Sequence, residues 1–378
     1  MKAATLEDVE KMTVTEVSDP PIGSRDVLLR VRAVGVCGTD LHLFRGQGNY
    51  NLDRQGHPIP LNVQPQILGH EFSGEIVETG REVKDLAPGE LVLCDQGRNC
   101  RSWGREPLCA YCAAGDSHQC LYYGEHGITG LPGALAQYIA MPAVNCLKLP
   151  EDMDTELGAL VEPLGCVLHA MDRLERAEAR YRFGGPQPVQ NVLICGAGPA
   201  GLLFLQYLRE VKRFEGRVLI SDLREKNLNL ASRLGGIAIN VKKQNLVEAV
   251  EELTLGERIQ CLIESCGNPA IFEQVPALLS KQGNILLYGH GHKGKDIGIW
   301  GNVLFLEPTL VASVGASGGF DADERPSTYR RARDLVGSKT IQVLPFVTHR
   351  YNSLEDIHQA FEHDFQREDY IKGLLTMT

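Results

Sequence analysis

Three glycines, Gly196, Gly198 and Gly201, constrain the fold of this chain more than any other feature of its sequence. They stand in NVLICGAGPAGLLFLQYL, where an apolar run typical of a buried strand leads into a helical segment that starts at Pro199. Glycines at such a turn let the backbone bend tightly and let a pyrophosphate approach the helix N-terminus. The next predicted strand ends in Asp222, 21 residues after Gly201, where an acid can bind ribose hydroxyls. The pattern therefore predicts a dinucleotide site.

The acid also bears on which dinucleotide is bound. Asp222 would repel a 2′-phosphate, which favours NAD over NADP. Arg224, two residues later, leaves that choice open. The alternative interpretation of the glycines is that they serve only the packing of a helix against a strand.

The two halves of the chain show different patterns. From about residue 25 to 150, short apolar–polar alternations such as DVLLRVRAVGV and FSGEIVETG are separated by turn signals, which indicates a β-rich domain. After residue 162, strands and helices alternate, which predicts a parallel sheet with helices on both faces. The chain ends in YIKGLLTM, a further predicted strand. We expect an α/β protein with segments 1–161, 162–316 and 317–378.

Four cysteines lie close together in RNCRSWGREPLCAYCAAGDSHQC, a stretch with few bulky apolar residues. Cys109 and Cys112 form a CxxC pair, and Cys100 and Cys120 lie on either side of it. Such a pair with two more thiolates can hold one tetrahedral Zn²⁺, which would supply the folding energy that this stretch lacks. Disulfides and unligated thiols are the alternatives. We expect a structural zinc site, in which Cys94 or a carboxylate is an alternative to Cys100.

Net charge and the N-terminal residues argue against several classes of protein. The 378 residues carry a formal net charge of −10, which argues against binding to nucleic acid or an anionic membrane. The same charge argues against a zinc-ribbon nucleic-acid binder as an explanation of the four cysteines. The start, MKAATLEDVEKM, lacks the apolar core of a signal peptide, so we expect a cytoplasmic protein whose thiols stay reduced.

Three further motifs offer possible metal ligands. Their spacing does not distinguish a second metal site from buried structural residues, because the motifs are far apart in the chain. The motifs are GVCGTDLH, LGHEFSG and LVEPLGC, and they contain Cys37, Thr39, Asp40, His42, His70, Glu71, Glu162 and Cys166.

The chain carries these motifs in one order with the cysteine-rich stretch and with GAGPAG followed by SD. This series of motifs resembles that of the zinc-dependent medium-chain dehydrogenase/reductase family. The chain is most similar to the sorbitol, threonine and polyol dehydrogenase branch. The resemblance implies a GroES-like catalytic domain and a Rossmann domain, with residues 317–378 returning to the catalytic domain. It also implies two Zn²⁺ ions per chain, NAD, a small-molecule alcohol as substrate, and a homodimer or homotetramer.

The resemblance also implies roles for individual residues. Cys37 and His70 correspond to the first two ligands of a catalytic zinc, Glu162 to the third with Cys166 as its competitor, and Glu71 to an outer or transient ligand. The expected structural-zinc ligands are Cys100, Cys109, Cys112 and Cys120. Thr39 and His42 are expected to carry the substrate proton to solvent. The expected cofactor-binding residues are Gly196, Gly198, Pro199, Ala200, Gly201, Asp222, Arg224, Asn227, Cys266 and Gly289. His290 and His292 follow a strand at the nicotinamide end, and we expect them to be exposed loop histidines, with contact to substrate or cofactor as the alternative.

The family activity implied is hydride transfer from a secondary alcohol, such as a polyol, sugar, cyclitol or amino alcohol, to NAD. The alternative is a non-catalytic zinc- and NAD-binding sensor or scaffold. Two departures from the family pattern bear on these expectations. The segment Leu43–Ile67 between the first two ligands is long and polar, and eight residues rather than two separate Cys100 from Cys109.

Overall fold

The computed structural model describes residues 1–290 and 303–377. The chain divides into two compact units, Met1–Gly165 with Gly315–Thr378, and Cys166–Val314. We call them the larger and the smaller unit and describe each separately. In the described part of the chain, none of the helices is both long and apolar enough to cross a bilayer.

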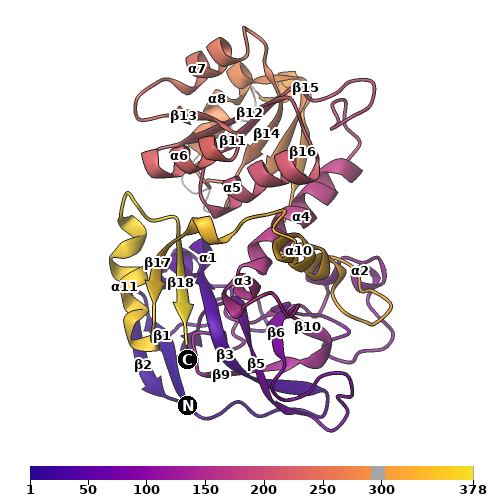
Figure 1. Cartoon of the computed structure of the whole chain (residues 1–378), viewed down its shortest axis with the longest axis vertical. Helices are drawn as coiled ribbons and strands as arrows, with labels where there is room; N and C mark the ends of the chain where they lie inside the picture. The colour runs from indigo at the N-terminus through magenta and orange to yellow at the C-terminus, as the bar shows by residue number, and fades with distance from the viewer. Residues whose placement is uncertain (291–302, 378) are drawn as a thin grey trace. The chain divides into compact units, whose positions relative to one another are not determined.

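The larger unit is built around a seven-stranded sheet (Figure 1). Its strands run in the order β10-β6-β5-β3-β18-β17, with β9 also paired to β3, and only the β17–β18 pair among them is parallel. Their bounds are β3 (Asp26–Val36), β5 (Glu71–Thr79), β6 (Leu91–Cys94), β9 (Tyr138–Pro142), β10 (Cys146–Lys148), β17 (Val347–Tyr351) and β18 (Lys372–Thr376). Buried and less buried residues alternate along most of β3, as expected of a strand with one face on a core. The β-rich prediction is confirmed.

Smaller elements complete this unit. Strands β2, β1 and β4 form a three-stranded sheet, and β7 pairs with β8. The remaining strands are β1 (Lys2–Asp8), β2 (Lys11–Glu16), β4 (Gln66–Ile67), β7 (Gly97–Arg98) and β8 (Gly124–Glu125). The helices are α1 (Gly38–Phe44), α2 (Ala110–Ala113), α3 (Thr155–Ala159), α10 (Ser327–Gly337) and α11 (His358–Glu362), and α4 (Val161–Arg176) runs from this unit into the smaller one. Short 3₁₀ turns occupy η1 (Ser117–Gln119), η2 (Ala143–Asn145), η6 (Leu344–Phe346), η7 (Leu354–Asp356) and η8 (Asp364–Gln366).

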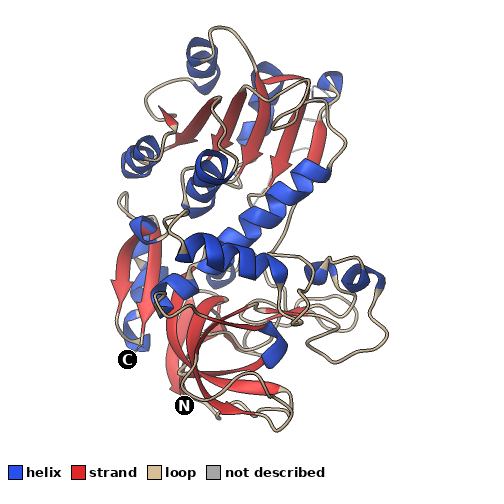
Figure 2. Ribbon diagram, turned by 45° about the vertical axis from the view of Figure 1, so that its right-hand side comes forward, coloured by secondary structure: helices blue, strands red, loops and turns tan. Residues whose placement is uncertain are grey.

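The smaller unit is a six-stranded parallel sheet with helices on both faces (Figure 2). The strand order is β13-β12-β11-β14-β15-β16. This is the doubly wound arrangement, in which strands are added on one side of β11 and then, from β14 onward, on its other side. The strands are β11 (Asn191–Cys195), β12 (Arg217–Asp222), β13 (Ile237–Asn240), β14 (Ile259–Glu264), β15 (Leu279–Leu287) and β16 (Thr309–Ala312). The helices are α5 (Pro199–Gln206), the π-turn η3 (Tyr207–Val211), α6 (Glu225–Arg233), α7 (Leu246–Leu253), α8 (Ala270–Leu278) and the 3₁₀ turn η5 (Leu304–Leu306). The predicted parallel sheet is confirmed.

Burial explains why β11 reads as an apolar run without alternation. All five of its residues are buried, because helices cover the sheet on both sides. Helices α7 and α8 contribute Val250 and Phe272 to one core, which also contains Leu193 of β11. The packed sheet and helices therefore hold the end of β11, where the glycine turn begins.

Candidate metal centres and dinucleotide site

The first candidate centre brings together Cys37, His70 and Glu71, whose potential ligand atoms all lie within 4.8 Å of one another. Cys37 follows β3 and is the N-cap of α1, and Glu71 is the first residue of β5. Strands β3 and β5 are antiparallel and pair Gly35 with Glu71, so the end of one strand meets the start of the other. Residues that are 33 positions apart in the chain thereby converge.

Asp40 supports this group, and sequence reasoning gave it no role beyond that of a possible ligand. Its side chain is buried, with Oδ1 3.2 Å from His70 Nδ1 and Oδ2 accepting a 2.9 Å hydrogen bond from the Cys37 backbone N–H. Burial acts to lower the pKa of His70, but the Asp40 carboxylate and the Cys37 sulfur raise it well above its ordinary value. Because Nδ1 faces a carboxylate, Nε2 is the ring nitrogen suited to a metal. The position of an acid three residues after Cys37 is the signal that could have found it.

Lys372 is the second residue that sequence reasoning missed. It begins β18, which pairs with β3, and its ammonium forms a buried ion pair with Glu71, donating a 2.6 Å hydrogen bond to Oε1. Burial acts to lower the pKa of Lys372, but Glu71, Cys37 and Glu162 raise it above its ordinary value. A Cβ at Gly35 would lie 2.3 Å from Glu71 Oε2, so residue 35 must be small for the pair to form.

Glu162 lies outside the group of three. It stands in the first turn of α4 and is buried, and its Oε1 accepts a 3.1 Å hydrogen bond from Gln96 Nε2. Glu162 also contributes to the raised pKa of Lys372, but its carboxylate is not among the three groups that lie within 4.8 Å of one another. A thiolate, an imidazole and carboxylates are the donors that zinc prefers, so this donor set fits a zinc ion.

Thr39 and His42 lie on α1, directly after Cys37. The Thr39 Oγ1 atom is 3.7 Å from Cys37 Sγ, and His42 Nδ1 lies 2.6 Å from Gln47 Oε1. An amide oxygen only accepts hydrogen bonds, so His42 Nδ1 carries the proton in this contact and Nε2 is the basic nitrogen. The two side chains are three residues apart and so share one side of the helix.

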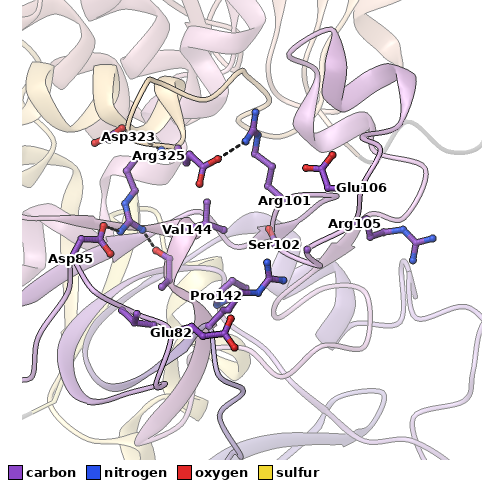
Figure 3. A pocket seen from close by; sticks show the side chains of 15 residues that line it. Glu82, Asp85, Arg101, Ser102, Arg105, Glu106, Pro142, Val144, Asp323 and Arg325 are labelled. Atoms are coloured by element: carbon purple, nitrogen blue, oxygen red, sulfur yellow. Dashed lines mark hydrogen bonds and ion pairs between the residues drawn. The ribbon is translucent and has the colours of Figure 1, made fainter.

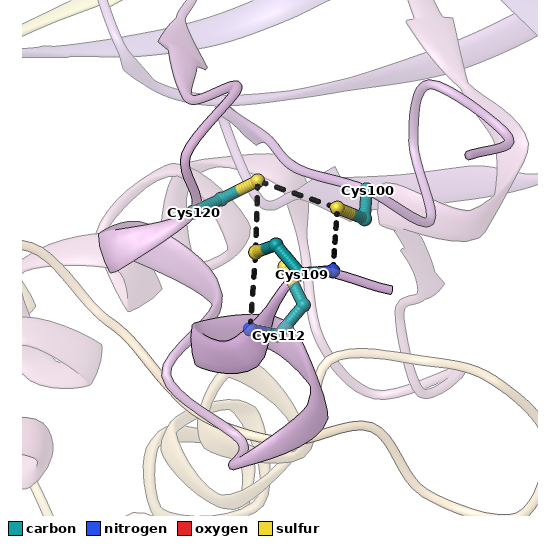
Figure 4. A group of neighbouring side chains, drawn as sticks. All are labelled: Cys100, Cys109, Cys112 and Cys120. Atoms are coloured by element: carbon teal, nitrogen blue, oxygen red, sulfur yellow. Dashed lines mark hydrogen bonds between the residues drawn. The ribbon is translucent and has the colours of Figure 1, made fainter. Parts of the chain in front are cut away.

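The second candidate centre holds all four cysteines of the predicted structural site (Figure 4). Cys120 Sγ lies 3.7 Å from Cys100 Sγ and 3.9 Å from Cys109 Sγ. Zinc–sulfur bonds of about 2.3 Å in a tetrahedron place the sulfurs about 3.8 Å apart, so the cluster has the size of a Zn–Cys₄ site. None of the eleven cysteines, which all lie in the described part of the chain, forms a disulfide, and these separations exceed the sulfur–sulfur bond of a disulfide.

Backbone groups favour the thiolate form of Cys109, whereas burial raises the pKa values of Cys112 and Cys120. The Cys109 sulfur accepts hydrogen bonds from the Cys112 backbone N–H, and the N–H groups of Cys112 and Leu121 lower the pKa of Cys109 to about 6. The eight-residue gap after Cys100 closes as a turn, in which the Arg105 N–H bonds to the Cys100 carbonyl. Cys94, the alternative ligand, instead lies 3.6 Å from Cys146 across the β6–β10 pair.

The glycine turn of the smaller unit has the geometry of a dinucleotide cradle. A Cβ on Gly201 would lie 1.8 Å from the Gly196 carbonyl oxygen, and Gly196 has φ +100°, so both positions need glycine for the fold. A Cβ on Gly198, the N-cap of α5, would meet nothing within 4 Å. Packing explains two of the glycines, and the third leaves room above the helix N-terminus, where Pro199 and Ala200 begin α5.

Asp222 lies beside this turn. Its Oδ2 accepts a 2.7 Å hydrogen bond from the Ala197 backbone N–H, and its Oδ1 accepts a 2.8 Å bond from the Arg224 N–H. The acid therefore ties the end of β12 to the glycine turn. Carboxylate oxygens accept more than one hydrogen bond, so both remain suited to ribose hydroxyls.

The other predicted cofactor residues are Cys266, Gly289 and Asn227. Cys266 adjoins the turn, since a Cβ on Gly196 would lie 3.0 Å from the Cys266 Cβ. Gly289 packs against Glu264, whose Oε2 would be 2.4 Å from a Cβ at that position. Asn227 is buried in α6. Cofactor contacts of these residues stay predictions, and His292 lies outside the described residues.

A separate cavity of about 340 Å³ lies in the larger unit, beside the turn after Cys100 (Figure 3). Arginines and acids line it, and several neutralise one another: Arg101 pairs with Glu324 at 3.1 Å, and Arg325 pairs with Asp85. None of the candidate metal ligands lines this cavity. The first of these ion pairs connects residues 323–325 to the cysteine-rich segment, and the second connects them to Asp85.

Comparisons with known proteins agree with this architecture. The family Alcohol dehydrogenase GroES-like domain matches residues 23–151, and the family Zinc-binding dehydrogenase matches residues 199–337. The chain is 30% identical to an L-threonine 3-dehydrogenase of Aeromonas hydrophila over 351 residues, which is 92% of this chain and 91% of that protein. It is 29% identical to the Shewanella loihica L-threonine 3-dehydrogenase over 96% of both chains.

Solved structures are similar over the whole chain. A zinc-binding dehydrogenase-like protein of Sinorhizobium meliloti, bound to NADP, has a TM-score of 0.79 at 29% identity and covers 99% of this chain and 98% of its own. Galactitol-1-phosphate dehydrogenase of Escherichia coli has a TM-score of 0.78 at 25% identity over 100% of both chains.

Fold and site define a two-unit GroES-like and Rossmann protein of the dehydrogenase class. The chain belongs to the zinc-dependent medium-chain dehydrogenase/reductase family, in its threonine and polyol dehydrogenase-like branch. Zinc and a nicotinamide dinucleotide are the cofactors of this class, as the sequence predicted.

Proposed function

We propose that this protein oxidises the secondary hydroxyl of a small polyol or amino alcohol and passes the hydride to NAD. The observation that carries the proposal is the convergence of Cys37, His70 and Glu71 at the start of α1, the helix that also bears Thr39 and His42. A scaffold protein needs the metal ligands but has no use for a hydroxyl and an imidazole one turn apart beside them. The substrate class is supported by relatives that are named as threonine and galactitol-1-phosphate dehydrogenases.

We assign the catalytic zinc to Cys37 and His70, which lie together, and to Glu162 on the strength of the family resemblance. We assign the structural zinc to the four clustered cysteines. When bound, zinc supplies Lewis-acid polarisation of the substrate hydroxyl, and the dinucleotide supplies the hydride acceptor. Asp40 holds the ring of His70 in one orientation through Nδ1. The ammonium of Lys372 pairs with the carboxylate of Glu71, so these two charges neutralise each other within the buried group.

The chain's own residues move the proton. The Thr39 hydroxyl, next to Cys37, accepts the hydrogen bond of the substrate hydroxyl and takes up its proton as its own proton moves on. His42 Nε2 is the basic nitrogen that receives this proton, since Gln47 holds the proton of Nδ1 in place. His42 is partly exposed and can therefore release the proton to solvent.

The preference for NAD over NADP rests on Asp222. A carboxylate bonded to Ala197 and Arg224 at the edge of the turn would repel a 2′-phosphate. We further propose a cytoplasmic homodimer or homotetramer, on the strength of the family resemblance. The segment Leu43–Ile67 is the place where we expect substrate selectivity to differ from the relatives.

The test is NAD⁺ reduction across a panel of linear polyols, aldoses, inositols, threonine and simple alcohols, repeated with NADP⁺ and after chelation. We expect chelator-sensitive turnover of one class with NAD⁺. Thr39→Ala should lower kcat by about 10²- to 10⁴-fold with zinc retained, whereas Thr13→Ala, a threonine on β2 bonded to Glu7, should leave kcat unchanged. A chain that binds zinc and NAD but turns over no alcohol would instead support the scaffold alternative.

A further inference from the structure

Gln96 contacts three other segments of the larger unit, one of them through Glu162. The residue is fully buried between β6 and β7. Its Nε2 donates to Glu162 Oε1 at 3.1 Å and to Glu125 Oε1 at 2.9 Å, while its Oε1 accepts the hydroxyl of Tyr329. One side chain therefore contacts α4, β8 and α10 at the same time.

This set of partners allows only one orientation of the amide. An amide nitrogen has two hydrogens to donate and the oxygen has none. Turning the amide over would place its oxygen between the Glu162 and Glu125 carboxylates, which is repulsive. The hydroxyl of Tyr329, itself buried, donates to the oxygen and holds the orientation in which both hydrogens point at carboxylates.

The backbone around Gln96 is held equally firmly. Asn145 Nδ2 donates at 2.8 Å to the carbonyls on both sides, those of Asp95 and Gly97, and the His126 N–H donates to the Gln96 carbonyl at 3.0 Å. Asp95 Oδ1 lies 3.0 Å from Nε2 of His118, which stands between Cys112 and Cys120 in the chain. The position of Gln96 is thus set by contacts with residues distant in the chain, one of which is His118 of the cysteine-rich stretch, and not by local sequence.

We propose that Gln96 is the positioning residue for Glu162, fixing the rotation of this carboxylate so that it can ligate the catalytic metal; this rests on the proposed function. A ligand carboxylate that is already oriented loses less freedom when the metal binds, and groups that orient metal ligands in this way typically contribute 10- to 100-fold to affinity. Without the amide, Glu162 and Glu125 lose the donor that they share, and the cost of a lost hydrogen bond at a buried carboxylate favours a different rotation of Glu162.

The experiment uses the full chain and the variant Gln96→Met, which keeps the length of the side chain and removes both N–H groups. The matched control is Gln66→Met, a buried glutamine of the same unit whose amide donates to Asn49 at 3.3 Å and not to a carboxylate. Tyr329→Phe removes only the hydroxyl that orients the amide. Zinc affinity is measured by competition with a chromophoric chelator, and Co²⁺ substitution reports the ligand geometry by its visible absorption.

We expect two zinc sites in the wild-type chain, and in Gln96→Met an affinity about 10- to 100-fold weaker at the site with mixed ligands and unchanged at the four-cysteine site. The Co²⁺ bands of the mixed site should shift in Gln96→Met, shift less in Tyr329→Phe, and match wild type in Gln66→Met. Unchanged zinc affinity and Co²⁺ bands in a folded, active Gln96→Met chain would overturn the inference alone. Equal losses in Gln66→Met would also overturn it, since the role would then be general packing. A wild-type chain with zinc only at the four cysteines and no turnover would overturn the proposed function itself.

Discussion

Alanine at the glycine turn separates the packing role of the motif from its cofactor role. At Gly201 a Cβ would lie 1.8 Å from the Gly196 carbonyl oxygen, so α5 must move by more than an ångström from β11. Overpacking of this kind costs about 1–3 kcal/mol. At Gly198 the backbone is extended, at φ −72° and ψ −175°, and a Cβ would meet nothing within 4 Å. Gly198→Ala should therefore change the free energy of unfolding by no more than about 0.5 kcal/mol.

NAD binding should rank the two variants in the opposite order, with Gly198→Ala the more affected. A methyl group on residue 198 occupies the space through which a pyrophosphate reaches the first N–H groups of α5, so the Kd for NAD should rise at least tenfold, or about 1.4 kcal/mol. The assay is thermal unfolding and calorimetric NAD titration of wild type, Gly198→Ala and Gly201→Ala. A folded Gly198→Ala chain with the wild-type Kd would refute a dinucleotide at this turn. A Gly201→Ala chain as stable as wild type would refute the packing argument.

Three further outcomes follow from the geometry. Cys100→Ser should reduce zinc content from two ions per chain to one and lower the Tm, and elemental analysis of this variant beside Cys94→Ser, which should keep both ions, checks it. Asp222→Ser removes the charge that repels a 2′-phosphate, so the NAD:NADP ratio of kcat/KM should fall at least about tenfold; an unchanged ratio would assign selectivity elsewhere. Burial lowers the pKa of His126 to about 4, so the unfolded chain takes up this proton first as pH falls, and stability should decrease between pH 6.5 and 4 by about 3 kcal/mol. His126→Asn, which can still donate to Pro132, should show a flatter denaturation profile over this range, and equal slopes would count against the assignment.

Several features of the fold could be read from the chain because they depend on short-range patterns. The alternation in β3 and the unbroken apolar run of β11 follow from how many faces of each strand are covered. A strand covered on one face alternates apolar and polar residues, and a strand covered on both faces is apolar throughout. The glycine turn was equally visible, since a tight turn requires glycine locally. The parallel sheet followed from the order of strands and helices.

The metal-site residues could be predicted from the sequence only in part. The CxxC pair predicted a cysteine site by its spacing, whereas the roles of Cys37 and His70 came from resemblance. Their convergence depends on the register of β3 with β5, which no local pattern encodes.

The remaining partners of the site belong to long-range structure. Lys372 lies 301 positions after Glu71, and Tyr329 lies 233 positions after Gln96. In the sequence they are an ordinary lysine and tyrosine, because a charge or hydroxyl gains its role only when the partner is buried beside it. Periodicity, turn chemistry and close ligand spacing were thus set within a few residues of chain. The pairing of buried charges was set by strand register and helix packing, because these bring distant polar groups into a common interior where each requires a partner.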